Sequence, residues 1–324
     1  MTFQEFTARI TEAVSERYSS AEISVQKITK DNGITLSGMT ITEEGEDKRT
    51  TVSPIVYLEP YYEKAEEGVP INQLARMLSE SYETAKWAGE RLDTSRFLSY
   101  EEAKDRVFCR MTGKEKNAER LTHMPHEDWQ DLAVTYYVDI PSFGGGSTSI
   151  VQVTDSLLSH WGIPESRLKA DAWKNTMEQK PLFIEPLGSV LTGMMGFADG
   201  PEADSPLYLL GTPGAEFGAI CAAYPDLPET AGALFDRNFY MLPSSVHEFL
   251  LLPDDGSISA ASLESLVRTI NGTEVSEQDV LSDRVYYCDA KTKEISLATE
   301  YEQKQKERRF EKEPMPTVYA APGL

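Results

Sequence analysis

Cysteine is scarce in this sequence. Its 324 residues include three cysteines, Cys109, Cys221 and Cys288, an odd number with no Cys-x-x-Cys spacing. Each lies within an apolar run, which is typical of a buried free thiol in a reducing compartment. The count and spacing argue against a disulfide-stapled secreted domain, and we expect all three thiols to be buried and reduced.

Long apolar runs are missing as well. No stretch of the sequence approaches the roughly 18 apolar residues of a membrane-spanning helix. Residues 1–6 also lack the basic-then-apolar pattern of a secretion signal. These absences predict a cytoplasmic protein that does not associate with a membrane.

Positive charge is scarce. The 31 Lys and Arg residues face 53 Asp and Glu residues, which gives a formal net charge of −22. Binding to nucleic acid depends on neutralising phosphates with Lys and Arg, so direct nucleic-acid binding is not expected. An acidic surface fits a protein partner with a basic surface, although solubility alone also explains the charge. The sequence does not set the oligomeric state.

The clearest local pattern lies near the N-terminus. Apolar residues recur at helical spacing from Phe3 to Val14 and predict an amphipathic helix. Alternating residues over 22–28 and 34–41 predict two strands joined by a turn at Asp31-Asn32-Gly33. Further strands are expected at 54–58, 106–111, 132–140, 148–153, 217–223, 239–242 and 247–252, and further helices at 74–82, 114–121, 155–161, 227–235 and 260–270.

These elements predict an α+β fold with a mixed, mainly antiparallel sheet and packed helices. Residues 105–161 and 217–271 both follow a strand-helix-strand-strand-helix order, which suggests an internal repeat; a shared order of common elements is the alternative. We expect residues 1–298 to form one globular region, and 299–324 a charged, proline-containing, flexible tail in which a frayed helix precedes disorder. Within the globular region, 1–104, 105–195 and 206–298 are candidate sub-units, with a hairpin loop at 144–146 and a mobile loop at 196–205.

The densest group of reactive side chains comprises Ser244, Ser245, His247 and Glu248. A serine hydrolase needs a base within about 2.6–3.2 Å of the hydroxyl and a third group that orients this base. In an extended segment, Ser245 and His247 share one face while Glu248 lies on the other, so Glu248 cannot orient His247 without a bend. The simpler interpretation is a hairpin corner, in which serine hydroxyls satisfy backbone donors and His247 caps a strand.

Other candidate sites have weaker patterns. His123 and His126 could bind zinc, but Pro125 interrupts their spacing, and a loop leading into a strand is the simpler interpretation. Residues 211–218 are glycine-rich but lack the Lys-Ser/Thr of a phosphate-binding loop, so they predict a hairpin turn and no cofactor. Several aromatic residues could line a ligand groove, although core packing explains them equally well: Trp129, Trp161, Trp173, Tyr136 and Tyr137.

Five short motifs occur in a particular order: Asn32-Gly33-Ile34, residues 54–58 with Tyr61-Tyr62, residues 131–134, residues 242–248 and residues 281–286. In this combination, residues 1 to about 298 resemble a bacterial family catalogued as domain of unknown function 5688. The resemblance implies a cytoplasmic accessory role in Gram-positive gut bacteria, often on mobile elements. It implies no catalytic residues. The loops at 144–146 and 199–200 and the segment after Ala298 differ in length from the family pattern.

Two functions from different classes are consistent with these patterns. The leading hypothesis is a non-enzymatic accessory protein that binds another protein through its acidic surface. The alternative is a hydrolase that uses Ser245 and His247, with a carboxylate contributed from elsewhere in the chain. The position of the His247 ring relative to Ser245 discriminates between them.

Overall fold

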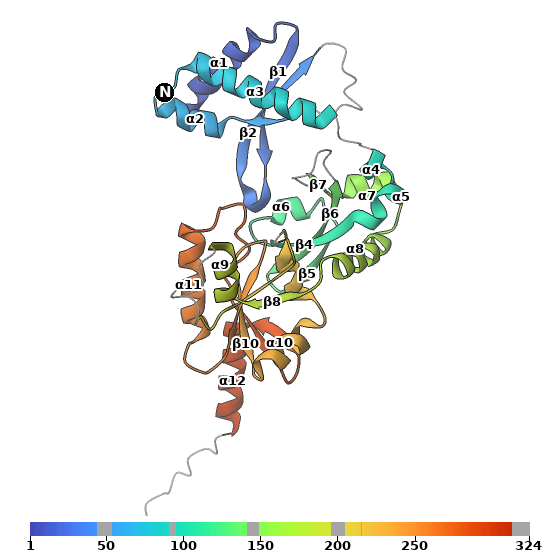
Figure 1. The fold of residues 1–324 in the computed structure, drawn as a ribbon, viewed down its shortest axis with the longest axis vertical. Helices are drawn as coiled ribbons and strands as arrows, with labels where there is room; N and C mark the ends of the chain where they lie inside the picture. The colour runs from blue at the N-terminus through green and yellow to red at the C-terminus, as the bar shows by residue number, and fades with distance from the viewer. Residues whose placement is uncertain (44–53, 91–94, 141–148, 196–204, 215, 313–324) are drawn as a thin grey trace, which may run out of the picture. The chain divides into compact units, whose positions relative to one another are not determined.

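The computed structural model describes residues 1–43, 54–90, 95–140, 149–195, 205–214 and 216–312. Within these ranges the protein has an α+β fold with three antiparallel sheets and packed helices, which confirms the predicted fold class (Figure 1). The chain divides into two compact units. The first contains Met1–Arg106 and Val138–Pro164, and the second contains Val107–Tyr137 and Glu165–Leu324.

The first unit begins with helix α1 (Phe3–Ser15), which Thr2 and Glu5 cap reciprocally. Strands β1 (Ala21–Thr29) and β2 (Thr35–Glu43) then form an antiparallel hairpin. Its turn places Asn32 at φ 60° and Gly33 at φ 72°, in the left-handed region that Asn and Gly adopt most readily. The helix and the hairpin that the sequence predicts are both confirmed.

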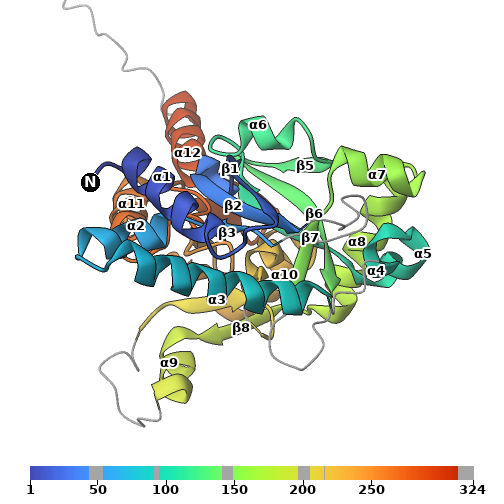
Figure 2. The ribbon, with the colours of Figure 1, turned by 90° about the horizontal axis from the view of Figure 1, so that it is seen from above.

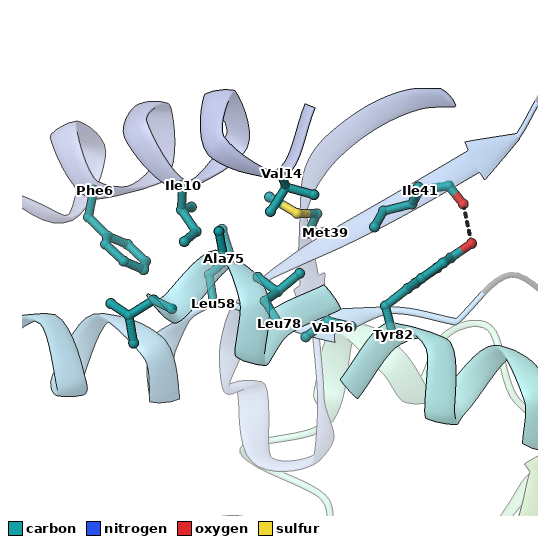
Figure 3. Close-up of a cluster of buried hydrophobic side chains, with 11 residues drawn as sticks. Phe6, Ile10, Val14, Met39, Ile41, Val56, Leu58, Ala75, Leu78 and Tyr82 are labelled. Atoms are coloured by element: carbon teal, nitrogen blue, oxygen red, sulfur yellow. Dashed lines mark hydrogen bonds between the residues drawn. The ribbon is translucent and has the colours of Figure 1, made fainter. Parts of the chain in front are cut away.

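A short strand and two helices complete this part of the first unit. Strand β3 (Val56–Tyr57) pairs with β2, while α2 (Glu59–Glu66) and α3 (Ile71–Glu90) follow. Helices α1 and α3 lie side by side (Figures 1 and 2). Their apolar faces and the sheet bury one core, in which the Tyr82 hydroxyl donates to the Ile41 carbonyl at 2.7 Å (Figure 3). The core includes Phe6, Ile10, Val14, Met39, Ile41, Leu74, Leu78 and Tyr82.

The rest of the first unit consists of short elements. These are α4 (Ser95–Leu98), α5 (Tyr100–Ala103), the 3-10 helix η2 (Lys104–Arg106), β7 (Ser149–Gln152) and α7 (Asp155–Trp161). The indole N–H of Trp161 donates to the Phe97 carbonyl at 2.8 Å, and its ring contacts Tyr100. Trp161 therefore has a packing role.

The second unit contains two sheets. In the smaller one, β6 (Leu132–Ile140), whose last residues from Val138 onward belong to the first unit, lies between β4 (Val107–Gly113) and β5 (His126–Trp129). Helix α6 (Ala118–Leu121) connects β4 to β5, and α8 (Glu165–Gln179) packs on β4. The Thr176 hydroxyl on α8 accepts the backbone N–H of Cys109 at 2.8 Å, which fixes the helix to the strand.

The larger sheet has the strand order β13-β12-β10-β11-β9-β8. Its strands are β8 (Phe183–Pro186), β9 (Tyr208–Gly211), β10 (Phe239–Pro243), β11 (Phe249–Pro253), β12 (Tyr286–Asp289) and β13 (Glu294–Leu297). Its helices are α9 (Leu187–Met195), α10 (Leu227–Phe235), α11 (Ala260–Thr273) and α12 (Ala298–Lys312). Helix α11 buries Leu263 and Val267 against Tyr240 and Leu242 of β10, which places the helix over one face of the sheet (Figure 1).

The predicted internal repeat is wrong. Residues 217–223 are predicted as a strand, but Gly218–Ala223 form a 3-10 helix, η3. The first segment also contains three strands after its first strand and helix, whereas the second contains two. The predicted hairpin turn at 211–218 is wrong for the same reason, because β9 is followed by η3. In a short run of fully buried residues, polar and apolar positions do not alternate. The sequence pattern therefore cannot distinguish a strand from a helix there.

Three further expectations concern the segments that the sequence singled out. All three cysteines are free and buried, as predicted. Burial raises the pKa of the Cys221 and Cys288 thiols to about 12.

The loops at 144–146 and 196–204 and the residues after Lys312 lie outside the described residues, whereas residues 298–312 form α12. Across the described ranges, no helix has both the length and the apolar character needed to cross a bilayer.

Candidate functional site

The candidate site is the turn that joins β10 to β11. Pro243 and Phe249 form the last pair of the two strands, and the residues between them leave the extended conformation. The backbone N–H groups of Ser244 and Ser245 both donate to the Glu248 carbonyl at 3.2 Å. The expected extended geometry is therefore wrong here, and the turn brings Ser245 and Glu248 together.

The Ser245 hydroxyl has two partners within the turn. It donates to Oε1 of Glu248 at 3.0 Å and accepts the backbone N–H of His247 at 3.0 Å. Ser245 itself is buried. The hydroxyl thus satisfies a backbone donor, as the hairpin-corner interpretation predicts, and its proton points toward a carboxylate rather than an imidazole.

The His247 ring is directed away from the Ser245 hydroxyl. Its Nδ1 accepts the backbone N–H of Phe217 at 3.2 Å, and its ring stacks on the Phe217 ring at 5.6 Å and 24°. Because Nδ1 accepts a hydrogen bond, the neutral ring carries its proton on Nε2, which lies 3.8 Å from Oδ1 of Asp279. This arrangement contains no hydrogen bond between the ring and Ser245.

Phe217 connects the turn to the interior of the second unit. It lies in the left-handed region at φ 54°, and the Arg110 guanidinium lies over its ring at 4.9 Å. Burial lowers the pKa of Arg110 to about 10, while Tyr137 and Asp279 act in the opposite direction. Gly218 allows the backbone after Phe217 to lie close to the turn, because a Cβ at this position would lie 2.5 Å from the His247 carbonyl oxygen.

A groove with a volume of about 580 Å³ opens beside this turn. We call it the acidic groove, because four of its lining residues are Glu or Asp and none of its described lining residues is Lys or Arg. The lining includes Glu216, Ser245, His247, Glu248, Glu274 and Asp279. Such a groove favours cationic over anionic groups.

A second groove, of about 240 Å³, runs along α11, and we call it the apolar groove. Its lining is almost entirely aliphatic and includes Leu207, Leu242, Leu250, Leu252, Ile258, Leu263, Leu266 and Ile270. The sequence analysis did not identify it. Its signal is the wide apolar stripe of α11, in which Leu263, Leu266, Val267 and Ile270 follow the i, i+3, i+4, i+7 pattern.

The other candidate residues have structural partners. Nδ1 of His126, in β5, lies 2.8 Å from the Met124 carbonyl oxygen, and His123 is exposed. Nowhere in the described ranges do three or more His, Cys, Asp or Glu side chains gather as metal ligands would. The Trp173 indole and the Tyr136 hydroxyl both donate to Glu127, and Trp129 packs on Tyr286. Tyr137 contacts Phe217.

Comparison with known proteins identifies a family but no activity. A family model described as a family of unknown function (DUF5688) matches residues 3–290. No curated protein and no solved structure matches the chain.

Proposed function

Since the chain belongs to the DUF5688 family of unknown function, we propose a function from the geometry of the site. We propose a non-enzymatic accessory protein that acts in the cytoplasm and binds another protein with a basic surface. An association with mobile elements accords with the family resemblance. The observation that carries the proposal is the acidic groove, which gathers four carboxylate side chains without a Lys or Arg among its described lining residues.

The charge of the groove accords with that of the whole chain. At a net charge of −22, the chain attracts cationic partners over a range set by the ionic strength. Within the groove, the charged side chains come from three separate segments, at Glu216, Glu248 and 274–279. The fold therefore concentrates negative charge on a concave surface. This arrangement supports a role in recognising a partner better than it supports a role in solubility alone.

The hydrolase alternative gains no support from the arrangement of the side chains. A general base must accept the proton of the nucleophilic hydroxyl. Here, Nδ1 of His247 accepts the Phe217 N–H, and the Ser245 hydroxyl donates to Glu248. Moving the ring to Ser245 would break the bond to Phe217.

The test measures binding of Arg-rich and Glu-rich fluorescent peptides by anisotropy at low and at physiological salt. We expect binding of the Arg-rich peptide alone, weakened by salt. The triple variant Glu216→Gln, Glu274→Gln, Asp279→Asn should reduce this binding. A matched control removes three exposed carboxylates of the first unit, through Glu12→Gln, Glu16→Gln and Glu63→Gln. Equal loss in both variants would indicate nonspecific attraction and would contradict the proposal.

The same preparation tests the alternative. The chain is incubated with a fluorophosphonate probe and with a panel of ester substrates. Labelling or turnover that both Ser245→Ala and His247→Ala abolish, at unchanged melting temperature, would favour a hydrolase over the binding protein proposed here.

A further inference from the structure

The apolar groove leaves large side chains in water. Leu266 is 51% exposed, Ile258 43% and Ile270 40%, and all three line this groove. Single exposed aliphatic residues are common on protein surfaces, but aliphatic residues gathered around one concavity are typical of interaction sites. This is therefore a surface that a partner could cover.

The two grooves adjoin each other, because Ser244 and Ile270 line both of them. Leu266, Ile270 and Glu274 follow each other at intervals of four residues along α11 and its C-terminal cap, so they share one face. The apolar and acidic surfaces thus form one bipartite surface along a single helix.

The acidic end of this surface also coincides with the end of α11. The helix stops at Thr273, and the acidic groove is lined by Ile270, Glu274, Val275 and Ser276 around that end. The C-terminus of a helix carries a partial negative charge, which favours cations. The helix end and the carboxylates therefore attract the same kind of group.

We propose that the two grooves form one docking site for a peptide segment of a basic partner protein. An aliphatic side chain of the segment occupies the apolar groove beside Leu266, and a Lys or Arg side chain lies near Glu274 and Asp279. This inference rests on the proposed function and specifies the chemistry of the partner. The charge complementarity of the adjoining acidic groove distinguishes this occupant from an apolar lipid or a neutral peptide.

The geometry of α11 sets the spacing in the partner. Glu274, the C-cap of α11, follows Leu266 by eight positions, which corresponds to a rise of about 12 Å at 1.5 Å per residue. An extended peptide advances about 3.3 Å per residue, so about three or four residues span this length. We expect the aliphatic residue and the cationic residue to lie three or four positions apart.

The experiment uses the full chain and fluorescein-labelled 12-residue peptides. The parent peptide carries Leu and Arg separated by four positions in a Gly-Ser background, and further peptides replace Leu with Ser, replace Arg with citrulline, or bring Leu and Arg next to each other. Anisotropy gives the dissociation constants. We expect the parent peptide to bind and each altered peptide to bind about tenfold more weakly, the scale on which one buried aliphatic side chain affects binding.

Two protein variants test the two halves of the site. Leu266→Ser should weaken binding of the parent peptide about tenfold but leave the Leu-to-Ser peptide unaffected. Glu274→Gln should weaken binding of the parent peptide but leave the citrulline peptide unaffected. The matched control is Leu234→Ser, because Leu234 is 53% exposed on α10 and lines neither groove. Thermal melts confirm that each variant is folded.

Several outcomes would overturn this inference. Binding of Arg-rich peptides that is indifferent to Leu266→Ser and Glu274→Gln would leave the proposed function intact but refute the bipartite site. The absence of any peptide binding up to ~1 mM, the weakest affinity that this assay can resolve, would refute both. A concentration-dependent dimer that Leu266→Ser dissociates would show instead that a second copy of the chain covers the groove.

Discussion

The backbone N–H of Phe217 donates to Nδ1 of His247 at 3.2 Å, and the two aromatic rings stack on each other. This pair joins the turn at the end of β10 to the start of η3, thirty residues earlier in the chain. Phe217 adopts a left-handed conformation to make the contact, at a cost of about 1–2 kcal/mol for a residue with a Cβ. The surrounding contacts must offset that cost, so the pair has a stabilising role.

Replacing His247 tests this role. His247→Ala removes the acceptor of the partly buried Phe217 N–H and the stacked ring, and a typical hydrogen bond contributes about 0.5–1.5 kcal/mol to stability. We expect a lower free energy of unfolding in urea titrations. His160→Ala, at an exposed position of α7, is the control and should change little. A His247→Ala variant that unfolds like the parent but loses a hydrolytic activity would make Ser245 and His247 a catalytic pair.

The contact between Gly218 and the His247 carbonyl gives a second prediction. A Cβ at Gly218 would lie 2.5 Å from that oxygen and 2.7 Å from the Thr212 nitrogen, both of them backbone atoms. Gly218→Ala should therefore destabilise the protein by about 1–3 kcal/mol, as overpacking does. Gly272→Ala is the matched control, because its Cβ meets nothing within 4 Å and α11 gains helix propensity. Equal melting temperatures for the two variants would show that the turn yields without strain.

Buried thiols and phenols determine how stability depends on alkaline pH. Burial raises the pKa of Cys221, Cys288 and Tyr240 to about 12. Between the ordinary values of 9.0 for Cys and 10.0 for Tyr and these raised values, the unfolded chain binds fewer protons than the folded chain. The free energy of unfolding should therefore fall as pH rises above about 9.

Urea titrations between about pH 7.5 and about pH 10.5 would measure this loss. Cys288→Ala should show a shallower decline than the parent, since it removes one of the contributing groups. Thiol-reactive probes at neutral pH should label the parent slowly. Rapid labelling of any cysteine would show that this thiol is accessible. Stability that rises with alkaline pH would contradict the raised pKa values.

The net charge predicts whether the chain binds nucleic acid and how its binding to a partner depends on salt. We expect no shift of duplex DNA in a gel at physiological salt, because a charge of −22 opposes the phosphate backbone. Association with a basic protein should weaken as the screening length falls from ~30 Å at 0.01 M salt to ~10 Å at 0.1 M. Tight binding of duplex DNA would remove the electrostatic basis of the proposed function. So would a partner whose affinity does not change with salt concentration.

Local patterns predicted the elements that depend on local forces. The helix from Phe3 and the hairpin around Asn32-Gly33 follow from periodicity and turn chemistry, and the structure confirms both. Residues 217–223 were predicted incorrectly because every side chain of η3 from Gly218 to Ala222 is buried, so no polar alternation reveals the backbone conformation.

The candidate site was only partly predictable for a different reason. The local cluster of Ser245, His247 and Glu248 is visible in the sequence, but an assumed strand separated Ser245 from Glu248. Phe217 and Asp279 lie thirty or more residues away from His247, and no local pattern indicates that they meet its ring. Tertiary packing, rather than any local preference, determines which atoms face the imidazole.

The cap of α11 has a consequence for the order in which the protein is assembled. Ser259 caps the first turn locally, but the N–H of Ala260 donates to Oε1 of Glu302 on α12, at 2.7 Å. A ribosome must therefore add 42 residues after Ala260 before that donor finds its partner. During synthesis, this N–H of the helix that lines both grooves therefore lacks its native partner until α12 has been made.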